Sequence, residues 1–190
     1  MSVAGVVLAA GAGSRFAGSG GSVPKQLARI RGLALVDHAL ASACAAGFDE
    51  VLLVDGSVDL SDRAAPGIIV LHNAAWADGI ASSLQVALTH ARAAGHQAIV
   101  VGLADQPGVT MQAWRSVADA PPTPPIAVAS YGGGRANPVR LPLSVWDLLP
   151  TSGDEGARTL MRERADLVRE VPCSGEHWDV DTTEDLERWI

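Results

Sequence analysis

Hydrophobic residues along this chain gather in short runs of strand length, and longer stretches with helical spacing lie between the runs. The runs do not alternate with polar residues, as they do in strands with one exposed face, so they predict strands that are buried on both faces. We expect such strands at residues 3–9, 51–54, 68–71, 98–103 and 126–130.

Helical stretches fill the intervals between these runs. We expect helices at residues 34–46, 80–94 and 111–118, of which the first two end at Gly47 and Gly95. The alternation of strand and helix predicts an α/β fold with a mostly parallel, Rossmann-like sheet and helices on both faces. Such sheets bind ligands at the carboxyl ends of their strands, so the loops after the strands are the first places to search for a site.

The pattern changes after residue 120. Residues 121–125 read Pro-Pro-Thr-Pro-Pro, which excludes a helix and predicts a stiff connector, and the three glycines at 132–134 predict a turn. Beyond them we expect a strand near Val139, helices at 145–149 and 156–164, a strand at 167–171 and a helix from Thr183. A length of 190 residues is that of one domain, so we expect residues 1–190 to form a single unit.

The charge and cysteine content exclude several classes of protein. The chain has 21 Asp and Glu against 14 Lys and Arg, a net charge of −7, and we therefore expect neither a nucleic acid nor a membrane as a partner. Cys44 and Cys173 form no CxxC pair and are too few for a disulfide framework. No signal peptide and no membrane-spanning apolar run is evident. We expect a cytoplasmic protein.

The first predicted strand continues into a glycine-rich loop, and a lysine follows ten residues after its arginine. The segment comprises Leu8, Ala9, Ala10, Gly11, Ala12, Gly13, Ser14, Arg15 and then Lys25. Small residues let backbone N–H groups surround a phosphate chain, and Arg15 and Lys25 add positive charge. Neither a Walker loop nor a dinucleotide fingerprint matches, because Phe16 stands where the latter needs glycine. We expect a triphosphate site, with a glycine-rich turn and solvated cations as the alternative.

Carboxylates follow one predicted strand and precede the last helix. Asp105 comes after a buried strand and Pro107 turns the chain away, so its side chain should face the ligand crevice. Mg²⁺ takes one or two protein carboxylates there and completes its shell with substrate phosphates and water. A cap on the following turn is the alternative for Asp105. For Glu184 and Asp185, at the start of the last helix, capping is the simpler interpretation.

These segments together resemble nucleotidyltransferases of the molybdenum cofactor cytidylyltransferase type (MobA/MocA-like), within the glycosyltransferase-A-like nucleotidyltransferase superfamily, over nearly the whole chain. The resemblance implies that the loop from Leu8 to Arg15 and Lys25 bind a nucleoside triphosphate. It implies that Asp181 shares a Mg²⁺ ion, or Mn²⁺ instead, with Asp105. The catalytic residues would be Lys25, Arg15 and Asp105. Residues 1–120 would form the nucleotide-binding half of the domain, and residues 121–190 would form the acceptor-side half.

Other segments match the acceptor side of that family. Trp76, Ser82 and Ser83 resemble an Asn-Trp-Gly-Ser-Ser segment, in which hydroxyls and amides at a helix start suit a phosphate. Trp76 would stack on a ring or serve as a core residue. Residues 135–139 resemble a Gly-His-Pro segment of the family, with Ala136 and Asn137 in place of Gly and His, and Asn137 is our fourth acceptor-binding candidate. Residues 152–155 read Ser-x-x-Glu and also predict a capping box.

The function that the resemblance implies is Mg²⁺-dependent transfer of CMP from CTP to a molybdopterin-type acceptor, with release of pyrophosphate. A molybdoenzyme or its chaperone would receive the product. Guanylyl-transferring relatives resemble Leu-Ala-Gly-Gly at the loop, so the methyl group of Ala10 should favour CTP over GTP, unless Ala10 only faces the core. The alternatives are a guanylyltransferase on molybdopterin or another phosphorylated acceptor, an NADPH-dependent oxidoreductase of the nicotine-blue type with Asp55 on the ribose, and a silent nucleotide-binding or cofactor-binding carrier.

Overall fold

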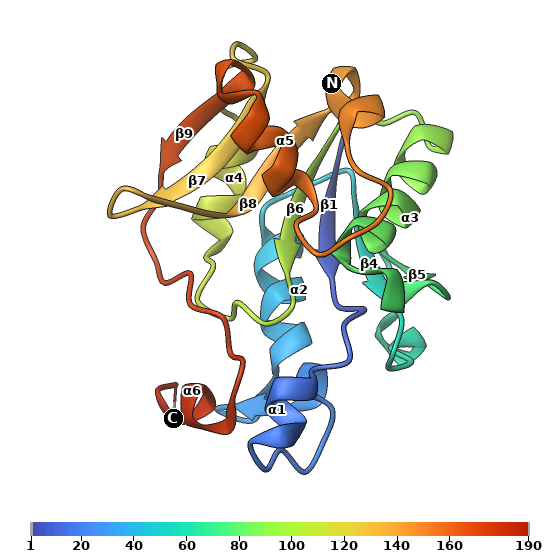
Figure 1. The fold of residues 1–190 in the computed structure, drawn as a ribbon, viewed down its shortest axis with the longest axis vertical. Coiled ribbons are helices and arrows are strands. Elements are labelled where there is room, and N and C mark those ends of the chain that lie inside the picture. The colour runs from blue at the N-terminus through green and yellow to red at the C-terminus, as the bar shows by residue number, and fades with distance from the viewer. Residues whose placement is uncertain (1, 190) are drawn as a thin grey trace.

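The computed structural model describes residues 2–189, and a seven-stranded sheet runs through its centre (Figure 1). The strands are β1 (Val3–Leu8), β4 (Glu50–Asp55), β5 (Ile68–His72), β6 (Ala98–Leu103), β7 (Ile126–Tyr131), β8 (Gly134–Pro142) and β9 (Val168–Pro172), in the order β5-β4-β1-β6-β8-β7-β9. The first four in this order are parallel, β8 is antiparallel to both of its neighbours, and β9 is parallel to β7. The prediction of a mostly parallel α/β sheet is confirmed.

Helices cover both faces of the sheet, which is why its strands carry continuous hydrophobic runs. Helices α2 (Leu35–Ala45) and α4 (Met111–Ala118) pack on one face, and α3 (Ile80–Ala93) and α5 (Ala157–Glu163) pack on the other. Strand β1 contributes to both layers, because Val7 packs in the first and Val6 and Leu8 in the second. Within residues 2–189, no helix has the length and apolar character that a membrane crossing requires.

Several local predictions differ from the structure. The segment at 145–149 belongs to a 3₁₀ helix, Leu143–Leu148, and the short helix α1 (Ser14–Gly18) and the hairpin of β2 (Arg29–Ile30) and β3 (Leu33–Ala34) were not predicted. The capping box at Ser152 and Glu155 is wrong, since α5 begins after Gly156 and has no side-chain cap. The backbone of Gly153 instead pairs with the start of α3, where it accepts from the Ala81 N–H at 3.0 Å.

The C-terminal tail returns to the beginning of the chain. Beyond β9 it runs down the molecule to α6 (Thr183–Glu187), which lies beside α1 (Figure 1). The Thr183 N–H donates to the Ser19 hydroxyl at 3.0 Å. Val180 is fully buried in a small core with Phe16 and Leu35. The residues around Val180 are therefore held next to the loop after β1.

Candidate active site

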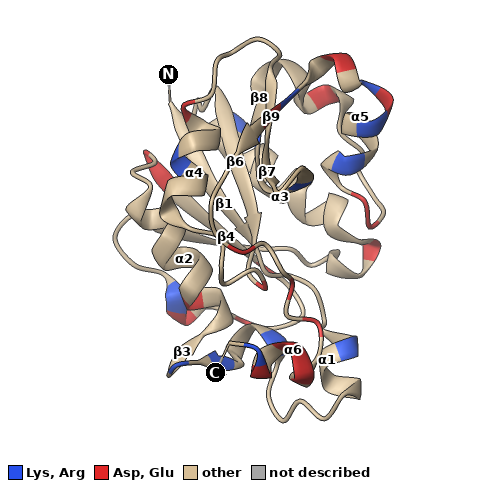
Figure 2. Ribbon diagram, turned by 90° about the vertical axis from the view of Figure 1, so that its left-hand side faces the viewer, with Lys and Arg blue, Asp and Glu red and all other residues tan. Residues whose placement is uncertain are grey.

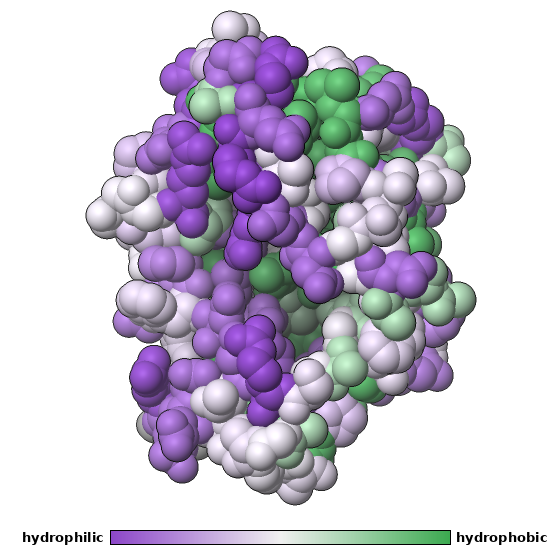
Figure 3. All heavy atoms as spheres, viewed as in Figure 1, coloured by the Kyte–Doolittle hydropathy of each residue, from purple (hydrophilic) through white to green (hydrophobic). Residues whose placement is uncertain are grey.

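A cleft opens at the carboxyl ends of β1 and β6, where the strand order changes direction and α/β sheets bind their ligands. It has two adjoining chambers. The Trp76 chamber, of about 350 Å³, lies between the glycine-rich loop and the 3₁₀ turn at Trp76–Asp78. The Asn137 chamber, of about 330 Å³, lies between the same loop, α3, β8, α5 and the C-terminal tail. Lys25 and Asp105 line both chambers and mark their junction. Figure 3 shows a hollow with an apolar floor in the middle of one face.

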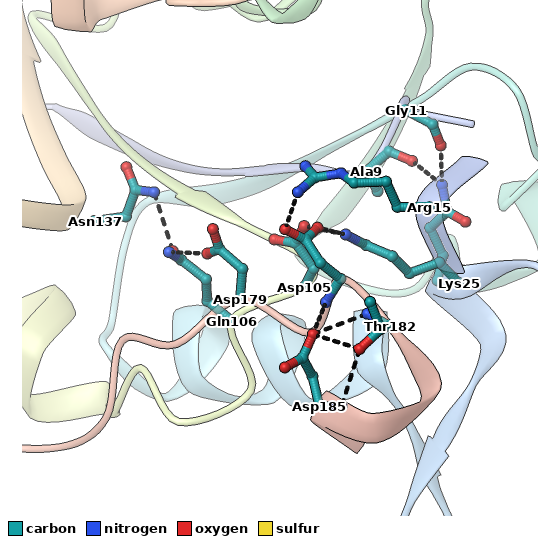
Figure 4. Close-up of polar contacts among 12 residues, drawn as sticks. Ala9, Gly11, Arg15, Lys25, Asp105, Gln106, Asn137, Asp179, Thr182 and Asp185 are labelled. Atoms are coloured by element: carbon teal, nitrogen blue, oxygen red, sulfur yellow. Dashed lines mark hydrogen bonds and ion pairs between the residues drawn. The ribbon is translucent and has the colours of Figure 1, made fainter. Parts of the chain in front are cut away.

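Gly13 permits the close approach of the loop to Lys25. Its φ of 62° is left-handed, and a Cβ atom at this position would lie 2.8 Å from the Cβ of Lys25. The next residue, Gln26, is buried, and its Nε2 donates to the carbonyls of Ala9 at 2.8 Å and Gly11 at 2.5 Å (Figure 4). The glycine-rich loop and the lysine are therefore fixed to one another.

Lys25 lies between two carboxylates that come from opposite ends of the chain. Its Nζ is 2.7 Å from Asp105 Oδ2 and 2.9 Å from Asp181 Oδ1, and Arg15 Nη1 is 2.6 Å from Asp181 Oδ2. The lysine side chain is only 14% exposed, whereas that of Arg15 is 76% exposed. Burial acts to lower the pKa of Lys25, but the charges and hydrogen bonds of Asp105 and Asp181 outweigh it, and the pKa rises. The ammonium group is therefore held charged at the junction.

The C-terminal tail brings a second carboxylate, that of Asp179, to the cleft beside that of Asp181. Successive side chains of an extended chain point to opposite sides, so Val180 enters the core while Asp179 and Asp181 face the cleft. The Val180 N–H donates to the Asp105 carbonyl at 2.9 Å, which fixes the tail against the end of β6. Gln106 Nε2 donates to Asp179 Oδ1 at 2.6 Å. Burial and then the charge of Asp105 raise the pKa of Asp179, so the charged form of this carboxyl group is less favoured than in water.

The four residues predicted on the acceptor side divide between the two chambers. Trp76 and Ser83 line the Trp76 chamber with the glycine-rich loop. Asn137 lines the other chamber, and its Nδ2 donates to Gln106 Oε1 at 3.0 Å (Figure 4). The Ser82 hydroxyl hydrogen-bonds to backbone carbonyls at the start of α3 and lines neither chamber.

The surroundings of Ala10 and Asp55 bear on which ligand the protein binds, because Ala10 is expected to favour CTP over GTP and Asp55 would contact the ribose of NADPH. Ala10 is 5% exposed, lines the Trp76 chamber and packs beside Gly56, whose added Cβ would lie 2.9 Å from that of Ala10 and 2.6 Å from that of Trp76. The Asp55 carboxylate is buried, accepts from the Leu60 N–H at 2.8 Å and is bonded to a histidine. Asp55 lines neither chamber, so it is not placed to contact a ribose there.

The donor set at the junction fits a hard divalent cation. Asp105 Oδ1 is buried and has no hydrogen-bond partner within residues 2–189, which leaves one carboxylate oxygen free to act as a ligand. Carboxylate oxygens are the ligands that Mg²⁺ and Mn²⁺ prefer. In the described part of the chain, no three His, Cys, Asp or Glu side chains are grouped closely enough to hold a metal ion. Asp105 and Asp181 would therefore hold such an ion together with substrate phosphates.

Sequence reasoning missed the polar residues that orient the charged ones. Gln26 and Gln106 follow Lys25 and Asp105 directly, and both amides are buried. The available signal was a glutamine directly after each of two charged site candidates. Asn73 begins the segment that resembles Asn-Trp-Gly-Ser-Ser, but no role was predicted for it; its Nδ2 donates to the hydroxyls of Ser82 and Ser83 at 2.8 and 2.9 Å.

An α/β sheet with a glycine-rich loop, a lysine and strand-end carboxylates at one crevice defines a protein class that binds phosphorylated ligands. The family model of the MobA-like NTP transferase domain matches residues 5–168, and the chain belongs to this family of nucleotidyltransferases. This confirms the family resemblance found in the sequence.

Individual relatives extend over the whole chain. Nicotine blue oxidoreductase of Paenarthrobacter nicotinovorans is 32% identical over 204 residues, which cover 99% of this chain and 96% of the relative. The crystal structure of Rv0371c from Mycobacterium tuberculosis H37Rv is 32% identical, covers 100% of this chain and 97% of its own, and superposes with a TM-score of 0.83. Its complex with manganese is 31% identical, with coverages of 100% and 98% and a TM-score of 0.80. A nucleotidyl transferase from Methanothermobacter shares the fold at 22% identity, coverages of 98% and 95% and a TM-score of 0.82.

Proposed function

We propose that this protein transfers a nucleoside monophosphate from a nucleoside triphosphate to a phosphorylated acceptor and releases pyrophosphate. The observation that carries the proposal is the position of Lys25 and Asp105 at the junction of two chambers. Two substrates that exchange a group must meet at one point, and this junction combines a cation for phosphate with carboxylates for a divalent metal. The Trp76 chamber takes the base and ribose of the nucleotide, the Asn137 chamber takes the acceptor, and the triphosphate lies at the junction, where the glycine-rich loop borders both. Trp76 and Ser83, expected on the acceptor side, then lie on the nucleotide's side.

The chemistry requires positioning and charge neutralisation rather than proton transfer. An anionic oxygen of the acceptor phosphate forms a bond to the α-phosphorus, and the bond from that phosphorus to the oxygen that bridges to the β-phosphate breaks. Pyrophosphate leaves with the electron pair, so no general base is needed. Lys25, Arg15 and the loop amides neutralise the charge of the triphosphate. A divalent ion bound by Asp105 and Asp181 would add Lewis-acid polarisation of the phosphates.

The proposed metal, nucleotide donor and acceptor rest on the family resemblance and on the residues that line the two chambers. Mg²⁺ is the proposed metal, because two carboxylates with phosphates and water suit its octahedral shell, and the manganese complex of Rv0371c supports a divalent ion in this family. CTP is the proposed donor, because the Ala10 methyl group lies in the wall of the Trp76 chamber. The proposed acceptor is of the molybdopterin type, and both halves of the chain, residues 1–120 and residues 121–190, line the chamber proposed for it.

An NADPH-dependent oxidoreductase is the second candidate, favoured by the 32% identity with nicotine blue oxidoreductase. The surroundings of Asp55 count against it, because that carboxylate is already occupied by a backbone N–H and a histidine. A silent nucleotide-binding carrier would use the same chambers without turnover.

The test is a panel of CTP, GTP, ATP and UTP with Mg²⁺ and a molybdopterin-bearing extract or purified cofactor, with pyrophosphate release as the readout. We expect release that depends on triphosphate, metal and acceptor together, with CTP preferred. A parallel arm measures NADPH oxidation with a quinonoid dye. NADPH oxidation without pyrophosphate release would establish the oxidoreductase, and nucleotide binding without either reaction would establish the carrier.

A further inference from the structure

A third cavity of about 400 Å³, which we call the arginine pocket, lies between α5 and β8 and adjoins the Asn137 chamber. The two cavities share Asn137, Val139, Arg158 and Met161. The arginine pocket and the Asn137 chamber therefore adjoin one another at these side chains.

The arginine pocket is basic in an otherwise acidic molecule. Arg135, Arg158 and Arg162 line it, and none of the residues described as lining it is acidic. Arg135 and Arg162 each pair with one glutamate at 2.8 Å, which leaves further N–H donors on each guanidinium group. Arg158 makes no ion pair with any of residues 2–189. Figure 2 shows basic and acidic residues side by side on and around α5, so the excess of positive charge is confined to the lining of the pocket itself.

The floor of the same pocket is apolar. Val128, Val139 and Met161 are buried at 1%, 5% and 8% exposure and contribute to both the floor and the core beneath it. The pocket thus combines apolar side chains at its base with guanidinium groups around it, and this combination suits an apolar or planar group that carries an anion.

We propose that the arginine pocket binds a second anionic group of the acceptor, at the end remote from the phosphate that attacks the nucleotide. The acceptor is then an elongated molecule with an apolar or planar body and a carboxylate, sulfonate or phosphate at its far end, which distinguishes it from a molybdopterin, whose single phosphate is the attacking group. That the bound molecule is the acceptor of the transfer rests on the proposed function. That the pocket binds a planar anionic molecule does not.

The experiment compares binding of naphthalene-2-sulfonate and 2-naphthol to the full chain by calorimetry, with and without Mg²⁺ and α,β-methylene-CTP. A charged hydrogen bond of this kind should make the sulfonate bind about tenfold more tightly than the naphthol. Arg158→Gln and Arg135→Gln should each remove most of this preference. Arg115→Gln, at an exposed arginine of α4, makes the same change of charge and should not alter it. Thermal unfolding verifies that all three variants fold.

The outcomes separate the two proposals. If neither Arg158→Gln nor Arg135→Gln reduces the preference for the sulfonate, the proposal that the arginine pocket binds an anionic group is wrong. A loss in Arg158→Gln alone would place the anion in the Asn137 chamber, because Arg135 lines only the arginine pocket, and would also overturn it. If the nucleotide analogue does not bind but the preference depends on both arginines, the proposed function fails and the arginine pocket stands.

Discussion

Replacement of Lys25 by methionine should make the protein bind a divalent metal more tightly when no nucleotide is present. Lys25 is the only lysine in the sequence, and its ammonium group lies between the two carboxylates that we assign to the metal. A divalent ion that approaches Asp105 and Asp181 must first displace that ammonium group. In the wild type, the phosphates of a nucleotide give Lys25 another partner, so metal and nucleotide should bind cooperatively.

The size of the effect follows from the two contacts of 2.7 and 2.9 Å. A hydrogen bond to a charged group contributes about 1.5–3 kcal/mol, so removal of the competitor should increase metal affinity about tenfold to a hundredfold. The same change leaves neighbouring carboxylates without their cation and should cost about 3–5 kcal/mol of folding stability at most. Added metal should restore part of that loss, because it binds the folded state.

The assay is a titration of nucleotide-free protein with Mn²⁺, in which electron paramagnetic resonance measures the free ion. Lys25→Arg keeps the positive charge and serves as the matched control, with an affinity expected near that of the wild type. If Lys25→Met binds Mn²⁺ no more tightly than Lys25→Arg, the ammonium group does not compete for the metal position and the reasoning is wrong.

Three further changes test other parts of the molecule. Asp105→Asn and Asp181→Asn should each lower turnover at least about a hundredfold with an unchanged circular dichroism spectrum, and near-normal turnover in both would refute their shared role. Ala10→Gly should reduce the CTP:GTP ratio of kcat/KM, because a methyl-sized obstruction supplies about 1–3 kcal/mol of discrimination; an unchanged ratio removes Ala10 as its cause. The Val3 N–H and then the Ser2 hydroxyl hold the pKa of Asp49 below its usual 3.8. Because the folded pKa is the lower one, this carboxylate stabilises the fold above pH 3.8, and the contribution disappears as the pH falls through the folded pKa. Asp49→Asn should therefore lower the melting temperature at neutral pH but not in strong acid, and an equal loss at both would contradict the assignment.

The sequence by itself determined the features that depend on short-range order. Strands buried on both faces must carry continuous hydrophobic runs, so the β-strand at Ala98–Leu103 could be located within its run. The carboxyl end of such a strand faces the crevice, and Asp105 is found there, beside the loop that contains Gly13. These features needed only the local pattern and the topology rule for α/β sheets.

Only the tertiary structure decided which distant groups meet. Asp181 lies 156 residues from Lys25, and nothing near either residue specifies their contact. The burial of Val180 against Phe16 and the Val180 N–H bond to the Asp105 carbonyl bring the tail back. The capping box at 152–155 failed for the same reason, because a local hydrogen bond of about 1 kcal/mol yields when the backbone finds partners in another helix. Local patterns act over a few residues, whereas the contacts that assemble this site form only when the whole sheet is in place.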